Sequence, residues 1–275
     1  MSIPATSVSL AAEPRPTYGA KTRPVWALLA SPYALFLLVL LIVPFANVAF
    51  FSIHSYSPTK ILLPELTFDN YRKLFDLYYL RLFGRTLRLG LVTTIVCVLL
   101  GYPLAYFLAR ARPRVQTVGL FLLIMPLMVS TVIRVFGWIV ILGRKGLVNI
   151  FLPFMVLPLM ASIERIPPSL EEAAQNLGAN WLQTFARVIL PLSVPGLISG
   201  CLLVYSISIS AFVTPALLGN SRERMAAQQI YDEVLVSFNW PSASSLALAL
   251  VALTLVLMFW ALFATRRTGR RERAS

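Results

Sequence analysis

Residues 35–43 read Leu-Phe-Leu-Leu-Val-Leu-Leu-Ile-Val, and the surrounding stretch 24–59 contains no Asp, Glu, Lys or Arg. A helix rises about 1.5 Å per residue, so about 20 apolar residues cross the hydrocarbon core of a bilayer. Five further uncharged stretches follow along the chain: 89–109, 115–133, 146–163, 188–221 and 234–265. The pattern predicts an all-α integral membrane protein with six transmembrane helices.

The fourth of these helices is expected to be short. Its stretch, 146–163, is interrupted by Asn149, Pro153 and Pro158, and a helix of that length covers only about 27 Å. If it did not cross, the Arg-rich C-terminus would lie outside, against the positive-inside rule. We therefore expect helix four to span the membrane.

Composition supports the same fold class. Hydrophobic residues make up 58% of the chain and charged residues 13%, whereas a soluble domain has about 45–50% apolar residues. Much of the net charge of +13 lies beside apolar runs, where arginine marks the cytoplasmic side. These flanking arginines are Arg110, Arg112, Arg114, Arg266, Arg267, Arg270, Arg271 and Arg273. A weaker interpretation is recruitment of acidic membrane lipid by the C-terminal cluster; a nucleic-acid partner is not favoured.

The charges also predict the domain organisation. Residues 1–25 form a cytoplasmic N-terminal tail, residues 26–266 a membrane-spanning domain, and residues 267–275 a basic cytoplasmic tail. Both termini are expected in the cytoplasm. A polar loop at 164–191 then lies on the cytoplasmic side between helices four and five.

This loop contains the most specific motif in the chain. Residues 167–178 read Pro-Pro-Ser-Leu-Glu-Glu-Ala-Ala-Gln-Asn-Leu-Gly. Ser169 with Glu172 three residues later predicts a capping box that begins a helix. Gly178 is expected to end that helix in the left-handed conformation.

A second short helix is expected after the glycine. Asn180 with Gln183 can begin it, and Pro191 is expected to limit its extension. The loop is therefore predicted to be a helix, a glycine turn and another helix that project from the membrane. Its small residues leave a surface that can fit closely into a groove of another protein.

The spacing Glu-Ala-Ala, three residues, Gly, nine residues, Ile, one residue, Leu-Pro resembles the cytoplasmic signature of permease subunits of bacterial ATP-binding-cassette (ABC) importers. The chain matches it at Glu172, Ala173, Ala174, Gly178, Leu190 and Pro191, with Val188 in place of Ile. The resemblance covers about residues 25–265 and implies a type I importer permease fold with a coupling helix. Such a helix docks on a dimer of cytoplasmic ATP-binding subunits.

The resemblance also implies roles for single residues. Glu172 faces basic groups of the ATPase, Ala173 and Ala174 pack in its cleft, and Gly178 allows the bend. The whole set expected to take part in coupling is Ser169, Glu171, Glu172, Ala173, Ala174, Gly178, Leu190 and Pro191.

No Gly-x-x-x-x-Gly-Lys-Ser/Thr loop occurs in the chain. We therefore expect no cofactor here, no enzyme activity in this chain, and ATP with Mg on the partner ATPase. The resemblance further implies a bacterial inner-membrane location, a periplasmic solute-binding protein, and a second permease subunit, either a different chain or another copy. A gradient-driven secondary transporter is the rival class. It is less favoured because such proteins often carry ionisable residues inside the membrane, whereas no predicted span of this chain contains Asp or Glu.

The sequence points to the substrate less directly. Phrases at 69–71, 101–106, 211–219 and 239–241 resemble the polyamine-type branch, which carries spermidine or putrescine, while related branches carry ferric iron, opines or other small solutes. No Asp or Glu lies in a predicted span. Relatives usually have an outer loop after a phrase like 146–149, whereas this chain passes almost at once to Phe-Leu-Pro-Phe at 151–154.

Helix five, expected at about 192–218, carries unusually many polar residues. Ser206 and Ser210 are four apart and share a face, which favours a solute pathway, although small hydroxylated residues equally favour close helix packing. The pathway candidates are Tyr205, Ser206, Ser210, Thr214 and Ser130. Arg134 can face the pathway or extend to the membrane interface.

Overall fold

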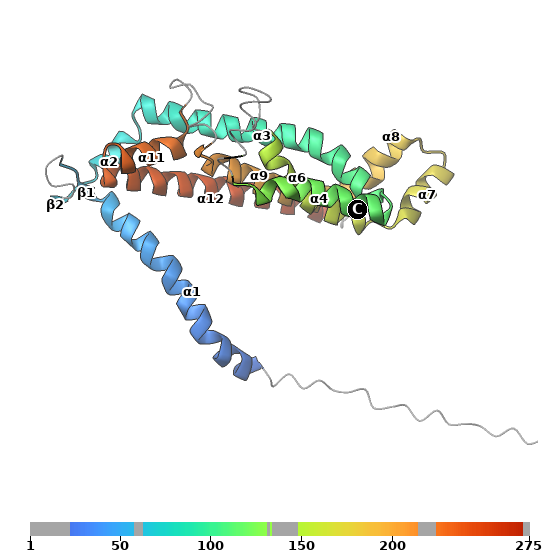
Figure 1. Ribbon diagram of the computed structural model, residues 1–275, viewed down its shortest axis with the longest axis horizontal. Coiled ribbons are helices and arrows are strands. Elements are labelled where there is room, and N and C mark those ends of the chain that lie inside the picture. The colour runs from blue at the N-terminus through green and yellow to red at the C-terminus, as the bar shows by residue number, and fades with distance from the viewer. Residues whose placement is uncertain (1–22, 58–62, 131–132, 134–147, 214–223, 272–275) are drawn as a thin grey trace, which may run out of the picture. The chain divides into compact units, whose positions relative to one another are not determined.

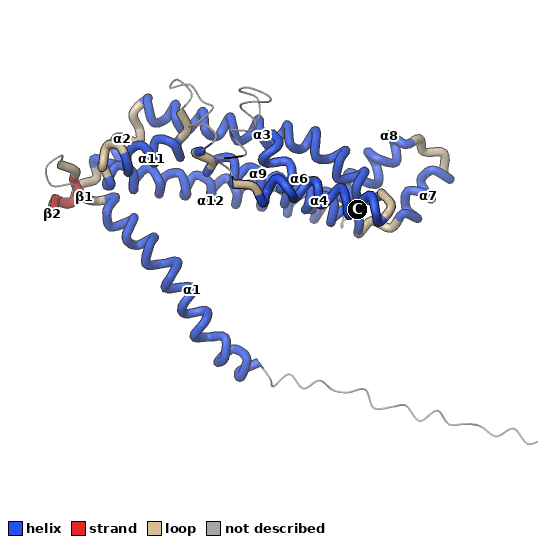
Figure 2. The backbone as a smooth tube through the Cα atoms, in the orientation of Figure 1, coloured by secondary structure: helices blue, strands red, loops and turns tan. Residues whose placement is uncertain are grey.

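The computed structural model describes residues 23–57, 63–130, 133, 148–213 and 224–271 (Figure 1). Most of these residues are helical, and Figure 2 shows one pair of short strands among them. The chain divides into two compact units, residues 1–47 and 48–275. The elements are α1 (Arg23–Ser52), β1 (His54–Ser55), β2 (Leu63–Leu66), α2 (Asp69–Lys73), α3 (Leu77–Arg110), α4 (Pro113–Met128), α6 (Val148–Glu164), α7 (Pro168–Asn176), α8 (Trp181–Thr184), the π-helix η2 (Phe185–Ile189), α9 (Leu190–Ser210), α11 (Ala226–Leu235) and α12 (Trp240–Arg271).

Four helices in the described part of the chain are long and apolar enough to cross a membrane. They are Ser31–Ser52, Leu77–Arg110, Trp181–Ser210 and Trp240–Phe263. Helices α4 and α6 coincide with the predicted third and fourth spans but have only 16 and 17 residues, fewer than the ~20 that a span usually needs. The all-α membrane fold is confirmed, and the count of six spans stays a prediction.

Three helix ends differ from those that the sequence suggests. Helix α3 begins at Leu77, before the uncharged stretch 89–109, and α12 ends at Arg271, after the uncharged stretch 234–265. Helix α9 ends at Ser210, where Ala211 turns to an extended backbone, not at 218. The arginines that end the uncharged stretches mark where a helix leaves the lipid. The helix itself can continue past the bilayer, because its arginines are then solvated.

In the first unit, α1 exposes its apolar side chains on all sides. Their exposed fractions run from 44% at Leu37 to 67% at Tyr33. A helix that is apolar all round belongs in lipid or against other apolar helices. Its composition therefore fits a membrane span.

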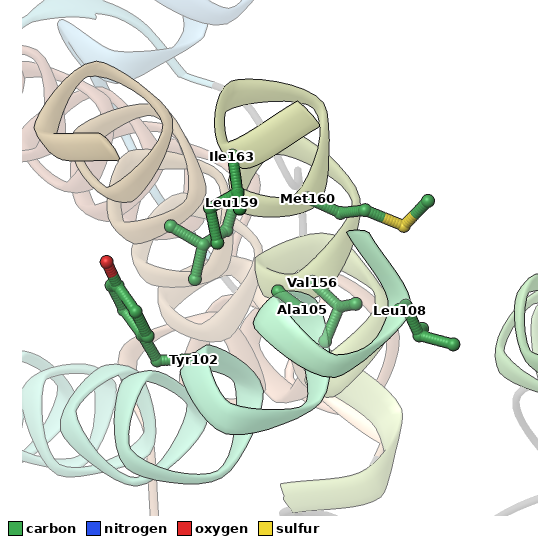
Figure 3. Packing of buried hydrophobic residues seen from close by; sticks show 7 residues of the cluster. All are labelled: Tyr102, Ala105, Leu108, Val156, Leu159, Met160 and Ile163. Atoms are coloured by element: carbon green, nitrogen blue, oxygen red, sulfur yellow. The ribbon is translucent and has the colours of Figure 1, made fainter. Parts of the chain in front are cut away.

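The second unit is built around α6, which packs against α3 and α9. Figure 3 shows seven buried residues that join α3 to α6. They are Tyr102, Ala105, Leu108, Val156, Leu159, Met160 and Ile163. Helix α6, which has the shortest of the six uncharged stretches, is thus enclosed by other helices. This position explains why its side chains are nearly all apolar.

Glycines let α9 approach α6 closely. A Cβ atom added at Gly196 would lie 2.3 Å from Ser162 Cβ and 2.8 Å from the Pro158 carbonyl oxygen. One added at Gly200 would lie 2.9 Å from Met155 Sδ. Small residues at such crossings allow the dense packing that holds membrane helices together.

At the end of the second unit that lies away from α7 and α8 (Figure 1), short elements pack on the long helices. Strands β1 and β2 pair antiparallel, with His54 opposite Leu66. The buried Asn70 side chain donates from Nδ2 to the carbonyl oxygens of Ser52 and His54, at 3.0 and 2.9 Å. Helix α11 packs on α12. The two hydrogen bonds of the Asn70 side chain tie the last turn of α1 and strand β1 to α2.

Candidate functional site

The loop between α6 and α9 contains α7, which begins earlier than predicted. Its N-cap is Pro167, Pro168 lies in the first turn, and no side chain caps it. The predicted capping box of Ser169 and Glu172 is therefore wrong. Proline at the first helical position lacks an N–H that would be unpaired there anyway, and its fixed φ suits the helix, so the helix begins without Ser169.

The glycine turn after α7 is confirmed. Gly178 has φ of +90°, its N–H donates to Gln175 O at 2.9 Å, and Ala179 N–H donates to Ala174 O at 3.0 Å. These bonds pair the carbonyls that a helix leaves unpaired at its C-terminus. A side chain with Cβ is strained at this φ.

The second half of the loop begins as predicted and ends differently. Asn180 and Gln183 form a reciprocal capping box, with bonds of 2.8 and 3.0 Å. Pro191 does not end the helix, because α8 passes through η2 directly into α9. A proline has no N–H to donate, and its ring needs more space than a regular α-helix leaves. The wider π turn just before Pro191 accommodates both. The prediction for Pro191 is therefore wrong, and one helical segment runs from the loop into the membrane bundle.

An ion pair fastens α7 to the end of α3. Arg110 donates to Glu171 Oε1 from Nε at 2.8 Å and also from Nη2, and Nη2 donates to Ile166 O at 3.0 Å. The other carboxylate oxygen of Glu171 accepts a bond from Tyr106 Oη at 2.9 Å. The Arg110 and Glu171 side chains are 20% and 13% exposed. These contacts fix α7 relative to the membrane helices.

Aromatic rings attach α8 to the same end of α3. Trp181 stacks on Phe185 with ring centroids 5.7 Å apart, and Phe185 meets Tyr106 edge-on at 6.3 Å. Tyr102 also packs edge-on against Phe185, at 5.1 Å. Both helices of the loop are therefore held by α3.

Four large apolar side chains of the loop are exposed, and they are together called the loop patch here. It consists of Leu170, Leu177, Trp181 and Leu182, which are 43%, 89%, 57% and 66% exposed. Exposed apolar groups gathered on one surface mark interaction sites. The exposed apolar side chains of the loop patch are of the kind that such sites use.

The predicted coupling residues fall into two groups. Exposed residues are Ser169, Glu172, Ala173, Gly178 and Pro191, and partly buried ones are Glu171, Ala174 and Leu190. Leu190 packs against the cluster of Figure 3. Arg110 and Tyr106 were missed by the sequence analysis, because 61 residues separate Arg110 from Glu171 and no local pattern links them.

The predicted pathway residues do not form one set. Tyr205 and Ser206 line a groove of about 450 Å³ between α3, α9 and α12. Ser210 is exposed and donates to Ser206 O at 3.0 Å, and Ser130 is exposed just beyond α4. Thr214 and Arg134 lie outside the described residues. Among the described residues, no group of three or more His, Cys, Asp or Glu could hold a metal ion.

A bundle of long apolar helices with an exposed loop held on one end defines the class as an α-helical membrane protein. Residues 97–270 match the model of the family described as binding-protein-dependent transport system inner membrane component. The chain belongs to this family. It is the membrane-spanning permease subunit of a binding-protein-dependent importer, a multi-pass inner-membrane protein, and not a catalytic subunit.

Two relatives illustrate the similarity. The chain is 35% identical over 222 residues to the spermidine/putrescine transport system permease protein PotB of Haemophilus influenzae, covering 70% of this chain and 78% of the relative. It is 36% identical over 224 residues to PotB of Escherichia coli, covering 70% and 82%.

A solved structure shares the fold. It is a bacterial ABC transporter involved in import of the acidic polysaccharide alginate, with a TM-score of 0.65 and 20% identity over 92% of this chain and 99% of that chain. The type I importer permease fold is therefore confirmed.

Proposed function

We propose that this chain couples ATP hydrolysis by a dimer of separate ATP-binding subunits, which hold ATP and Mg, to uptake of a polyamine such as spermidine or putrescine. The similarity to two PotB proteins supports the substrate. A periplasmic solute-binding protein delivers the solute, and a second permease subunit, a different chain or another copy, completes the pathway. Both termini lie in the cytoplasm.

The loop patch is the observation that carries the coupling half of this proposal. Apolar side chains exposed at a protein's surface are stabilised when a partner covers them. Glu172 lies in α7 and is exposed, so it can meet basic groups of the ATPase. Glu171 holds the loop on Arg110 instead. The two neighbouring glutamates thus have different roles.

The continuous helix from α8 into α9 is the route by which ATPase movement reaches the solute. Docking moves α8, and α9 carries Tyr205 and Ser206 at the groove with α3 and α12. These two side chains offer hydroxyl groups and an aromatic face, which bind a cationic solute weakly. The binding protein supplies the selectivity.

The test is uptake by the purified complex in vesicles. We expect ATP, the binding protein and radiolabelled putrescine together to give uptake that stops without ATP. Uptake driven by an ion gradient without ATP would refute the coupling half. ATP-driven uptake of an opine or ferric iron, with none of a polyamine, would refute the substrate half alone.

The loop is tested by a matched pair of variants. Gly178→Asp is expected to fold and to lose binding of the ATPase, because its carboxylate is placed unpaired beside the loop patch and is desolvated on docking. Gly178→Asn is the control, since asparagine has about the same size as aspartate, is strained to the same degree at this φ, and carries no charge. Copurification of the ATPase measures the result, and equal binding by both variants contradicts this role.

A further inference from the structure

The N-terminal part of α3 carries a row of arginines that neither the loop nor the pathway uses. Arg81, Arg85 and Arg88 are exposed and lie on one face of the helix, because positions i, i+4 and i+7 are neighbours along a helix. Helix α3 contains no Asp or Glu. The three charges of this face, called the arginine face below, are therefore not offset by an acidic residue of the same helix.

Two of these arginines line a hollow. A cavity of about 250 Å³ is lined by Leu77, Tyr78, Arg81, Leu82, Arg85 and Arg224. Its wall is fixed by side chains of α11: Tyr78 Oη donates to Gln229 Oε1 at 2.9 Å, and Arg224 pairs with Asp232 at 3.4 Å. The volume equals that of about eight water molecules, enough for a phosphodiester group.

The length of α3 places the arginine face at the level of lipid headgroups. Its 34 residues extend about 51 Å, whereas the hydrocarbon core needs about 20 residues. With Arg110 at one boundary, the other boundary falls near residue 90. Arg88 then lies at the edge of the core, Arg85 lies about 7 Å beyond it in the headgroup layer, and Arg81 lies about one helical turn farther out.

The same helix face continues into the membrane as an aliphatic surface. Val92, Ile95 and Leu99 follow the arginines along this face and are 49%, 50% and 67% exposed. Ile95 and Leu99 also line the groove of Tyr205 and Ser206, whereas Val92 does not. Positive charge at headgroup level with exposed aliphatic side chains below it matches the chemistry of a phospholipid. A soluble protein docking from outside would meet Arg81 but not the aliphatic part.

We propose that the arginine face binds the phosphate of an anionic phospholipid, in the leaflet at the α11 end of the bundle. Arg81 and Arg85 hold the phosphate at the cavity, Arg88 adds charge at the edge of the core, and the acyl chains enter the core along Val92, outside the groove of Tyr205 and Ser206. This proposal is independent of the substrate and of the ATPase.

The test compares lipids on the intact complex, purified in neutral detergent. Native mass spectrometry measures binding of dioleoyl phosphatidylglycerol and of dioleoyl phosphatidylcholine. Each arginine near an anionic lipid surface adds a similar increment to the affinity. We therefore expect Arg81→Gln/Arg85→Gln/Arg88→Gln to weaken phosphatidylglycerol binding by about tenfold or more. Phosphatidylcholine binding changes little.

Control variants make the result specific. Arg72→Gln/Lys73→Gln removes two exposed basic residues of α2 near the same end of the bundle but off the arginine face, and we expect it to leave lipid binding unchanged. Replacing the three arginines with lysine keeps the charge and should retain most of the binding. An excess of inorganic phosphate should not displace the lipid, because free phosphate lacks the acyl chains.

Three results would overturn the proposal. One is an equal loss of phosphatidylglycerol binding in the three-arginine and α2 variants, which would show that the lipid is attracted by surface charge in general. Another is displacement by inorganic phosphate alone, which means a free-anion site. The third is an unchanged lipid preference together with weaker binding of the periplasmic protein to the three-arginine variant, which means that the face docks protein. If the glutamine variant does not fold, the lysine variant and phosphate competition decide the question.

Discussion

Glu171→Ala tests whether the ion pair with Arg110 holds the coupling loop on the membrane bundle. The substitution removes the carboxylate that accepts bonds from Arg110 and Tyr106 and leaves the α7 backbone unchanged. A nine-residue helix such as α7 is unstable alone in water. Detachment of α7 from α3 therefore also unfolds it.

The magnitude follows from the geometry. A hydrogen bond to a charged group contributes about 1.5–3 kcal/mol, whereas an exposed ion pair contributes about 1 kcal/mol or less. Arg110 and Glu171 are 20% and 13% exposed, so the pair lies between these limits after screening by solvent. We expect the variant to lower the free energy of opening of α7 by about 2 kcal/mol, an increase of about 30-fold in the open population.

Hydrogen exchange of the α7 amides, measured on the complex in lipid nanodiscs, reports this population. We expect exchange about 30-fold faster in Glu171→Ala and unchanged exchange in Gln175→Ala, an exposed residue of α7 outside the coupling set. Arg110→Ala should resemble Glu171→Ala, and the double variant should add little. Unchanged exchange in Glu171→Ala, or fully additive effects, would refute the role of the pair.

Gly196→Ala and Asn70→Ala test the packing of the second unit, and Gly84→Ala is the control for the first of them. Gly196→Ala places a methyl group against Ser162 and the Pro158 carbonyl and should destabilise the protein by about 1–3 kcal/mol; Gly84→Ala, where no described atom lies within 4 Å, should be neutral or stabilising by up to about 1 kcal/mol. Thermal unfolding in detergent compares them, and equal melting temperatures contradict close packing. Asn70→Ala leaves two carbonyls unpaired and should cost about 1–3 kcal/mol; proteolysis near β1 no faster than in wild type contradicts this.

The sequence predicted those features whose signal is local. Uncharged apolar runs identified every long helix, and Gly178 and the Asn180–Gln183 pair were correct because a turn and a cap depend on residues a few positions apart. The prediction for Pro191 failed because it assumed regular α-helical bonding, whereas the π turn accommodates the proline. The wrong boundary of α3 had another cause, since hydropathy measures lipid contact and not helix length.

Long-range pairs were beyond the sequence. Arg110 was interpreted only as a charge at the cytoplasmic boundary, and its bond to Glu171 depends on how α3 and α7 meet in space. Glu171 was accordingly grouped with residues that face the ATPase. The central place of α6 was hidden too, because a short apolar run does not show whether its helix faces lipid or other helices.

The glycine crossing of α9 on α6 makes the segment from α8 to α9 a pivoted rod. The segment Trp181–Ser210 has 30 residues and is therefore about 45 Å long. Gly196 and Gly200 approach α6 closely at a point between the two ends of the segment. A segment held at that point rotates about it and does not slide. The arms from this pivot to Trp181 and to Ser210 are about 25 and about 18 Å, so a displacement of about 3 Å at the loop swings Ser210 by about 2 Å the opposite way.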